Sequence, residues 1–216
     1  LFNSGLLLYV PKNVVVDGPF VSAVNLPVGP TGQAVFPRVV VVAEANSHVT
    51  VVSAFANTDA EATDKSVTGT TLSNSFFEIT VGQGAKVTVM AVDKLSNAVF
   101  AVSRVRTHIH KDGVFNLTTA GLGGKQIKSD IETIMVEPGS HSDIRGVVLG
   151  DGSEHFSYNT IQEHTCPDTT SNINFRVALK DTSSSVYQGI VKVDKIAQRT
   201  NAFQSNKNLL NRKSVV

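Results

Sequence analysis

Two pairs of potential metal ligands stand out, because the members of each pair alternate along a stretch typical of a β-strand. They are His108 with His110 and His164 with Cys166, and Asp168 follows two residues after the second pair. Alternate residues of a strand share one face, so each pair places two ligands side by side. A structural zinc takes about four ligands and a catalytic zinc about three. His164 and Cys166 are therefore candidate metal ligands in an incomplete set.

A second interpretation of the same residues needs no metal. His108 and His110 would then be surface residues of a strand, and His164 and Cys166 would be packed in a turn before Pro167. The chain has one cysteine, so it cannot form an intramolecular disulfide, which favours a reducing compartment. An iron–sulfur cluster normally takes four thiolates, so this chain could not hold one alone.

Motifs for other chemistry fail on their residue types. The stretch from Gly121 to Gln126 has the glycines of a phosphate loop, but Gln126 replaces the required hydroxyl residue and the spacing differs, so a glycine-rich turn between strands is expected. Neither Gly-x-Ser-x-Gly nor His-Glu-x-x-His occurs. The sequence therefore nominates no catalytic residue. The remaining carboxylates of interest lie in expected turns, where Asp is common for its backbone hydrogen bonds: Asp143, Asp151, Glu154 and Asp168.

Charge and hydropathy exclude two broad classes of partner. The formal net charge is +1, which argues against nucleic acid, since a nucleic-acid footprint requires a strongly basic surface. The richest apolar run, Val39 to Ala43, is far shorter than the roughly 18 residues of a spanning helix, which argues against a membrane span. A local basic excess near the end reads as a solvated face, and its members are Lys192, Lys195, Arg199, Lys207, Arg212 and Lys213.

The elements that must position these residues are strands. The chain has 33 valines and no tryptophan, and β-branched side chains favour strands. Apolar and polar residues alternate at 86–92 and 99–106, which is the strand period. Asn57–Ser75 is predicted to be a long loop or, at its acidic start, a short helix. The predicted turns between strands are 28–32, 82–84, 111–113, 137–139 and 150–152.

A weak internal repeat suggests how these strands stack. Residues 148–153 and 178–183, 30 positions apart, both carry an apolar pair followed by a turn with Asp. Repeats of this length suit a solenoid, in which each coil buries its apolar row against the next. Strand–turn–strand patterns also produce such coincidences, so the repeat alone leaves a β-helix and a β-sandwich open.

An ordered series of motifs resembles the SufB/SufD family, the scaffold subunits of the SUF iron–sulfur cluster assembly system. Asn13 stands where the family usually has glycine, and Asn tolerates the same left-handed backbone. Ser205 stands where SufB members carry a cysteine, so the resemblance is greatest to the SufD branch. The motifs are Ser4–Gly5, Tyr9–Val14, 121–125, 146–149, 151–155, 162–164, Pro167, 171–172, 186–193 and 197–210.

The resemblance implies a right-handed parallel β-helix forming one core domain over residues 1–216. It further implies a non-enzymatic scaffold that pairs with SufB and the ATPase SufC, in the cytoplasm or, in a eukaryote, a plastid. The core alone would bind no cofactor, and the full complex would handle the cluster transiently. We expect the family's N-terminal helical region and its C-terminal SufC-binding region to lie outside these 216 residues. Strand edges would also permit a homodimer.

Two alternatives are kept. Parallel β-helices also occur in carbohydrate-active and adhesive proteins, which would require a groove lined by aromatic residues and carboxylates. The aromatic content of 6% speaks against this. A metal enzyme would need a tightly bound metal on His108, His110, His164 and Cys166.

Overall fold

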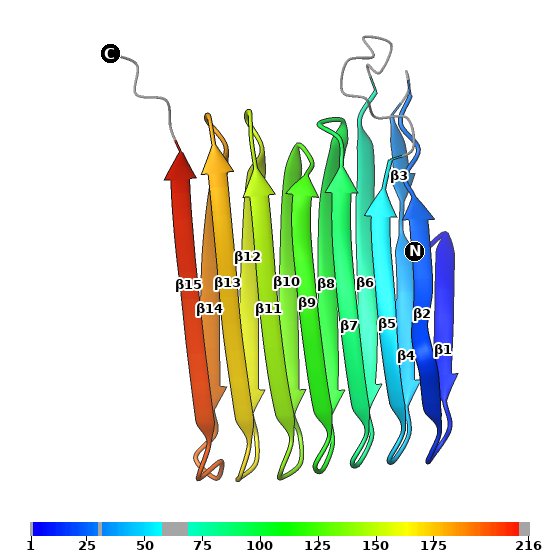
Figure 1. Cartoon of the computed structure of the whole chain (residues 1–216), viewed down its shortest axis with the longest axis vertical. Coiled ribbons are helices and arrows are strands. Elements are labelled where there is room, and N and C mark those ends of the chain that lie inside the picture. The colour runs from blue at the N-terminus through cyan, green and yellow to red at the C-terminus, as the bar shows by residue number, and fades with distance from the viewer. Residues whose placement is uncertain (1, 30–31, 58–68, 212–216) are drawn as a thin grey trace.

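The computed structural model describes residues 2–29, 32–57 and 69–211, and within these ranges it consists of strands and turns without a helix (Figure 1). The all-β prediction is therefore confirmed. The strands are β1 Ser4–Val10, β2 Val15–Asn25, β3 Gln33–Val35, β4 Pro37–Ala43, β5 His48–Ala56, β6 Thr71–Val81, β7 Lys86–Leu95, β8 Val99–Ile109, β9 Val114–Gly123, β10 Gln126–Met135, β11 His141–Gly150, β12 His155–His164, β13 Thr170–Lys180, β14 Ser184–Val193 and β15 Asn201–Asn211.

The strands form two sheets that face each other along a solenoid. One sheet has the order β1-β4-β6-β8-β10-β12-β14, with β3 beside β6, and the other has the order β15-β13-β11-β9-β7-β5-β2. Every pairing within them is parallel, for example β8 with β10 and β11 with β13. Figure 1 shows the chain passing from one sheet to the other at each turn, so two strands make one coil. The parallel β-helix prediction is confirmed, and the β-sandwich alternative is wrong.

The internal repeat identifies neighbouring coils but misplaces their register by one residue. Leu149 of β11 pairs with Ala178 of β13, an offset of 29 rather than 30. The turns follow the same register, because Gly152 and Asp181 both have a left-handed backbone, with φ of 53° and 58°. A one-residue slip would exchange the two faces of a strand, so the inward rows are defined only by the observed pairing.

The turns along one side of the solenoid, one from each coil, repeat a common geometry. Each has one residue with positive φ. From Asn13 to Asp168 the N–H of that residue donates to a carbonyl of the next turn, as from Asp112 to Pro138 at 3.1 Å. Asn13 has a φ of 64°, which confirms that this Asn takes the left-handed conformation expected of glycine. Its side-chain Oδ1 also accepts a 3.0 Å hydrogen bond from Asn46. The positive-φ residues of the turns on this side are Asn13, Asn46, Gly84, Asp112, Gly139, Asp168 and Arg199.

The loop prediction for Asn57–Ser75 is wrong at its end. Residues 71–75 begin β6, whereas residues 58–68 lie outside the described ranges. Thr71, Ser73 and Ser75 are buried and alternate with exposed Leu72 and Asn74. The strand period is therefore present, but hydroxyl residues occupy the inward positions and hide it from a search for apolar alternation.

The interior combines apolar rows with stacked aromatic rings. The ring of Phe175 lies 5.4 Å from that of Tyr158 and 4.8 Å from that of Tyr187, between centroids. Gly146 pairs with Phe175 in the neighbouring strand, and a Cβ at position 146 would collide with its ring. Burying an aromatic or aliphatic side chain of this kind contributes about 1.5–3 kcal/mol, so the stacking of coils supplies the stability of the fold.

A row of hydroxyl groups crosses this interior. Ser75, Ser103, Ser129, Tyr158 and Tyr187 pair successively from β6 to β14, so their side chains lie on one inward line. The Oγ atoms of Ser103 and Ser129 are 2.9 Å apart and share a hydrogen bond. The solenoid therefore contains a polar line within its apolar core.

Candidate functional site

His164 lies at the end of β12 and faces the interior, where it is completely buried. Its Nδ1 is 2.7 Å from Thr169 Oγ1 and its Nε2 is 2.9 Å from Ser171 Oγ. Both ring nitrogens are thus occupied by hydroxyl partners. Burial lowers the pKa of His164, because the interior disfavours the imidazolium form. The side chain is arranged as a neutral, hydrogen-bonded core residue.

Cys166 lies in the turn after His164 and is 8% exposed. Its Sγ donates a weak hydrogen bond to the carbonyl of Met135 at 3.4 Å. Burial is the largest cause that raises the pKa of the Cys166 thiol, and the charges of Glu137 and Asp168 raise it further. The reactive and metal-binding form of cysteine is the thiolate, so this environment favours the unreactive thiol.

The pair formed by His108 and His110 is divided between a strand and a turn. His108 belongs to β8, whereas His110 follows the strand end and lies 3.3 Å from Glu137 Oε1 through its Nδ1. In the described ranges, no group of three or more His, Cys, Asp or Glu side chains is arranged to hold a metal ion. The described residues therefore supply no third ligand beside His164 and Cys166. A metal site at these two residues stays a prediction.

The turn carboxylates have structural contacts. Asp168 forms two hydrogen bonds of 2.5 Å with the guanidinium of Arg199, and this contact lowers the pKa of the carboxyl. Asp143 pairs with Arg145 at 2.9 Å, and Glu154 accepts a 2.9 Å hydrogen bond from the N–H of Asp151. These carboxylates do not converge on a common centre.

The glycine-rich segment that partly resembles a phosphate loop is a turn. Gly123 ends β9 and Gly124 follows it, with φ of 90° and 105°, which only glycine adopts readily. Lys125 then packs over the ring of Phe100, with its Nζ 5.1 Å from the ring centroid. The expectation of a glycine turn between strands is confirmed.

The last described coil, formed by β14 and β15, has one unpaired side among the described residues. Within the described residues, β14 is hydrogen-bonded to β12 alone and β15 to β13 alone, so each strand has a free backbone edge. These strands are 10 and 11 residues long. Unpaired edges of this length are templates for pairing with another chain.

Apolar side chains accompany this edge. Val193 and Leu210 continue inward rows whose members in the covered coils are buried, yet their exposed fractions are 49% and 54%. Leu179, the partner of Leu210 in β13, is only 7% exposed. Further exposed apolar residues of the coil are Val186, Ile190, Val191, Ile196, Phe203 and Leu209. Exposed apolar groups around a free edge mark an interaction surface.

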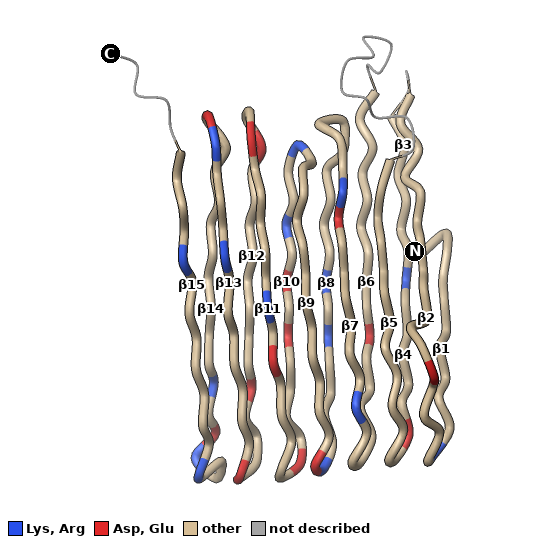
Figure 2. Tube along the Cα trace, in the orientation of Figure 1, with Lys and Arg blue, Asp and Glu red and all other residues tan. Residues whose placement is uncertain are grey.

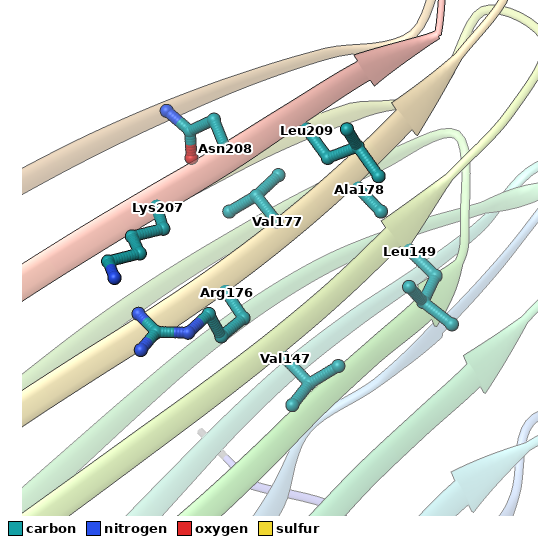
Figure 3. A pocket seen from close by; sticks show the side chains of 8 residues that line it. All are labelled: Val147, Leu149, Arg176, Val177, Ala178, Lys207, Asn208 and Leu209. Atoms are coloured by element: carbon teal, nitrogen blue, oxygen red, sulfur yellow. The ribbon is translucent and has the colours of Figure 1, made fainter.

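A groove of about 270 Å³ lies beside this edge on the outer face of β11, β13 and β15 (Figure 3). Val147, Leu149 and Leu209 form its apolar part, while Arg176 and Lys207 stand together at one side. A second surface groove of about 280 Å³ lies over β8, β10, β12 and β14. Neither groove contains an aromatic residue, so these two surfaces give the carbohydrate-binding alternative no support.

Figure 2 shows residues of both charges interspersed along the strands and turns of the chain trace. In the basic segment that follows Val191, Lys192 pairs with Glu163 and Arg199 pairs with Asp168. Arg212 and Lys213 lie outside the described residues. The described part of the chain contains no helix with the length and apolar character needed to cross a membrane.

The fold and its motifs agree with a known protein family. A family model described as SUF system FeS cluster assembly, SufBD core domain, matches residues 27–215. The chain belongs to the SufBD family. The matched range includes the series of motifs from Gly121 to Leu210.

Several SufBD relatives match most of this chain. It is 31% identical over 211 residues to the iron–sulfur cluster assembly protein SufD of Bacillus subtilis, covering 97% of the chain and 46% of that protein. The SufBD family protein slr0076 of Synechocystis is 24% identical over 94% of the chain and 45% of its own length. A SufBD protein of Staphylococcus haemolyticus is 23% identical over 88% of the chain and 39% of its own length. The chain thus spans less than half the length of these relatives.

Proposed function

We propose that this chain is the core of a SufD-like scaffold, which supports iron–sulfur cluster assembly without being an enzyme. In this role it pairs with a SufB-like subunit and acts together with the ATPase SufC in the cytoplasm or a plastid. The iron–sulfur cluster is the cargo of the whole assembly. The similarity to SufD of Bacillus subtilis over 97% of the chain supports this assignment.

The open C-terminal coil is the observation that carries the proposal. Its two free edges and exposed apolar residues offer a strand-pairing surface that one further coil of the same kind would cover. A SufB-like β-helix supplies such a coil. Pairing across both sheets would continue the inward rows at Val193 and Leu210 into the partner.

The interior chemistry agrees with a scaffold role. His164 has both nitrogens hydrogen-bonded, and the Cys166 thiol has a raised pKa. Neither group is prepared to bind a cluster within this core. The proposal therefore places cluster ligation elsewhere in the assembly, and assigns to this chain the task of holding its partner.

The test is co-purification of the full-length protein with SufB and SufC from the same organism. We expect a stable complex, and we expect Val193→Asp combined with Leu210→Asp to weaken SufB binding at least about tenfold, since tenfold is only 1.4 kcal/mol. Leu7→Asp with Val21→Asp, exposed sites in the first coil, is the matched control and should bind normally. No association of the wild type with either partner would refute the proposal.

A second copy of the chain is the competing occupant of the same edge. Sedimentation of the full-length protein alone and with SufB separates the two cases. We expect the heteromeric complex to displace any homodimer, because both use β14 and β15. A homodimer that persists unchanged beside SufB would contradict a shared edge.

A further inference from the structure

Asp93 is a carboxylate placed among inward-facing residues of the solenoid. It belongs to β7, in which Val87, Val89 and Leu95 at alternate positions are buried. Its neighbours in the sheet are Phe55 of β5 and Gly121 of β9. The strand period therefore turns Asp93 towards the core. Aspartate is rarely found in such a position without a partner.

An internal cavity of about 30 Å³ adjoins this carboxylate. A water molecule needs about 10–15 Å³ of such volume, so the cavity has room for about two water-sized occupants. Its polar wall consists of hydroxyl groups from both sheets, and its apolar wall includes Phe77, Leu117 and Ile131. The hydroxyl groups are those of Ser75, Ser103, Ser129 and Thr119.

Among the described residues, no cationic side chain lines the cavity at this carboxylate. The residues that line the cavity from β5, β6, β8, β9 and β10 include no Lys, Arg or His, and Asp93 is the one ionisable group among them. The ion pairs of the described residues all lie elsewhere, for example between Arg106 and Glu132 at 3.1 Å. Asp93 is only partly exposed, and a charge with little access to water and no counter-charge is unfavourable, so the site favours a proton or a cation from solution.

Two buried hydroxyl groups beside residues of the cavity region lack hydrogen-bond partners among the described residues; Ser53 is the sheet neighbour of Ala91, which lines the cavity. The Oη of Tyr158 and the Oγ of Ser53 are buried and form no hydrogen bond. Tyr158 pairs with Ser129, and its Oη lies against Gly121, the sheet neighbour of Asp93. The negative charge of Asp93 contributes to raising the pKa of Tyr158. Buried hydroxyl groups are normally satisfied, so the unpaired Tyr158 and Ser53 beside the cavity wall are consistent with an ordered occupant nearby.

We propose that the cavity binds one small monovalent cation of the size of sodium, coordinated by Asp93 and the surrounding hydroxyl oxygens. Carboxylate and hydroxyl oxygens are hard donors that suit hard cations. A single carboxylate neutralises one positive charge. Calcium requires about six to eight oxygen ligands and magnesium retains several waters, so the cavity is too small and too weakly charged for either.

The cation competes with a proton for the same carboxylate. Burial raises the pKa of Asp93 to about 6. Its structural neighbours add no other titratable group at the cavity wall, and Tyr158 stays protonated because burial raises its pKa. The cation should therefore bind above this pH and be displaced by a proton below it.

The test is thermal unfolding of the full-length protein in NaCl, KCl and choline chloride at equal ionic strength. Well above the pKa of Asp93, NaCl should raise Tm by roughly 3 °C over choline chloride, because a ligand of the native state stabilises it. KCl should have a smaller effect. Well below that pKa the difference should vanish.

Two variants make the assignment specific. Asp93→Asn should abolish the sodium effect, whereas Asp130→Asn should retain it, because Asp130 contacts Arg104 and Asn159 rather than the cavity. Sodium NMR line broadening by the wild type, absent with Asp93→Asn, measures binding without reference to stability. Identical Tm values in all three salts, with no broadening, would mean that the cavity holds water alone and would overturn the proposal.

Discussion

The two end coils of the solenoid differ in how their edges are built. At the N-terminal end, β1 has 7 residues, and β2 has a register shift between Val15 and Pro19. Bulges, short edge strands and proline all hinder pairing with another chain. At the C-terminal end, β14 and β15 have 10 and 11 residues, pair without a register shift and contain no proline. Among the described residues, the outer edge formed by β14 and β15 is therefore the more regular of the two.

The two ends differ in backbone regularity and not in apolar exposure. Both ends expose apolar residues, for example Leu7 at one end and Leu209 at the other, with exposed fractions of 69% and 70%. Hydrophobicity therefore does not distinguish the two ends. Backbone regularity does, because strand addition requires an uninterrupted row of N–H and C=O groups.

The largest expected effect compares a covered coil with the terminal one. Leu179 and Leu210 pair in register but are 7% and 54% exposed. Leu179→Ala should lower the free energy of unfolding by about 3 kcal/mol through lost burial and a cavity. Leu210→Ala should lower it by less than about 1 kcal/mol, because that side chain buries little area. Denaturant unfolding of the full-length variants measures both values.

Adding SufB extends the comparison of Leu179→Ala with Leu210→Ala. If the terminal coil is completed by the partner, Leu210→Ala should become more costly in the complex than in the free protein. Equal effects of Leu179→Ala and Leu210→Ala in the free protein would show that the terminal coil is already covered, which would contradict the open edge.

A second prediction concerns the interior, far from both ends. The pKa of Asp93 is about 6 in the folded protein and 3.8 without burial. The folded state thus binds the proton more tightly, so the stabilisation by protonation is complete below pH 3.8 and is lost as the pH rises through 6. The loss amounts to about 3 kcal/mol. Asp93→Asn should recover most of it at neutral pH.

Unfolding in choline chloride as a function of pH checks this, because choline cannot enter the cavity. The difference in stability between Asp93→Asn and wild type should grow as the pH rises from 4 to 7, and Asp130→Asn should show no such growth. A difference that is constant with pH would mean that Asp93 titrates as an exposed carboxyl does.

The smallest effect concerns Cys166, in the turn that precedes β13. Cys166→Ser keeps a donor for the carbonyl of Met135, so it should change the free energy of unfolding by less than about 1 kcal/mol. The thiol should react with a maleimide slowly in the native protein and rapidly in denaturant, because burial protects it. Fast labelling of the folded protein would show that the turn opens and would revive Cys166 as a reactive group.

The sequence was informative wherever inward residues are apolar. The alternation at 86–92 and 99–106 predicts parts of β7 and β8, and the breakers at 82–84 and 111–113 predict the turns that flank them. Thr71–Ser75 was missed because its inward positions carry hydroxyl groups, which resemble a loop in composition. Hydroxyl residues satisfy each other across coils, as between Ser103 and Ser129, and only the register shows this.

The candidate sites show the same division between features visible in the sequence and features that depend on the tertiary structure. His164 and Cys166 were noticed because their residue types are suited to metals, but their burial and hydrogen bonds are tertiary properties. Asp93 was overlooked because one aspartate at the end of an alternating strand is unremarkable in a sequence. The signal was its phase: it continues the inward positions of Val87 and Val89. A charged residue at one of the inward-facing positions of a predicted strand is therefore a candidate site residue even before the structure is known.

Hydrogen exchange of the full-length protein with and without SufB tests the central claim, that the C-terminal coil is the pairing edge. We predict that amides of β14 and β15 gain protection on binding. About half of the backbone N–H and C=O groups of an edge strand lack hydrogen-bond partners until another strand is added. Amides of β1, β2 and the covered strands β8–β11 should be unchanged. Protection confined to β1 and β2, or binding of SufB without any protection of β14 and β15, would contradict the account.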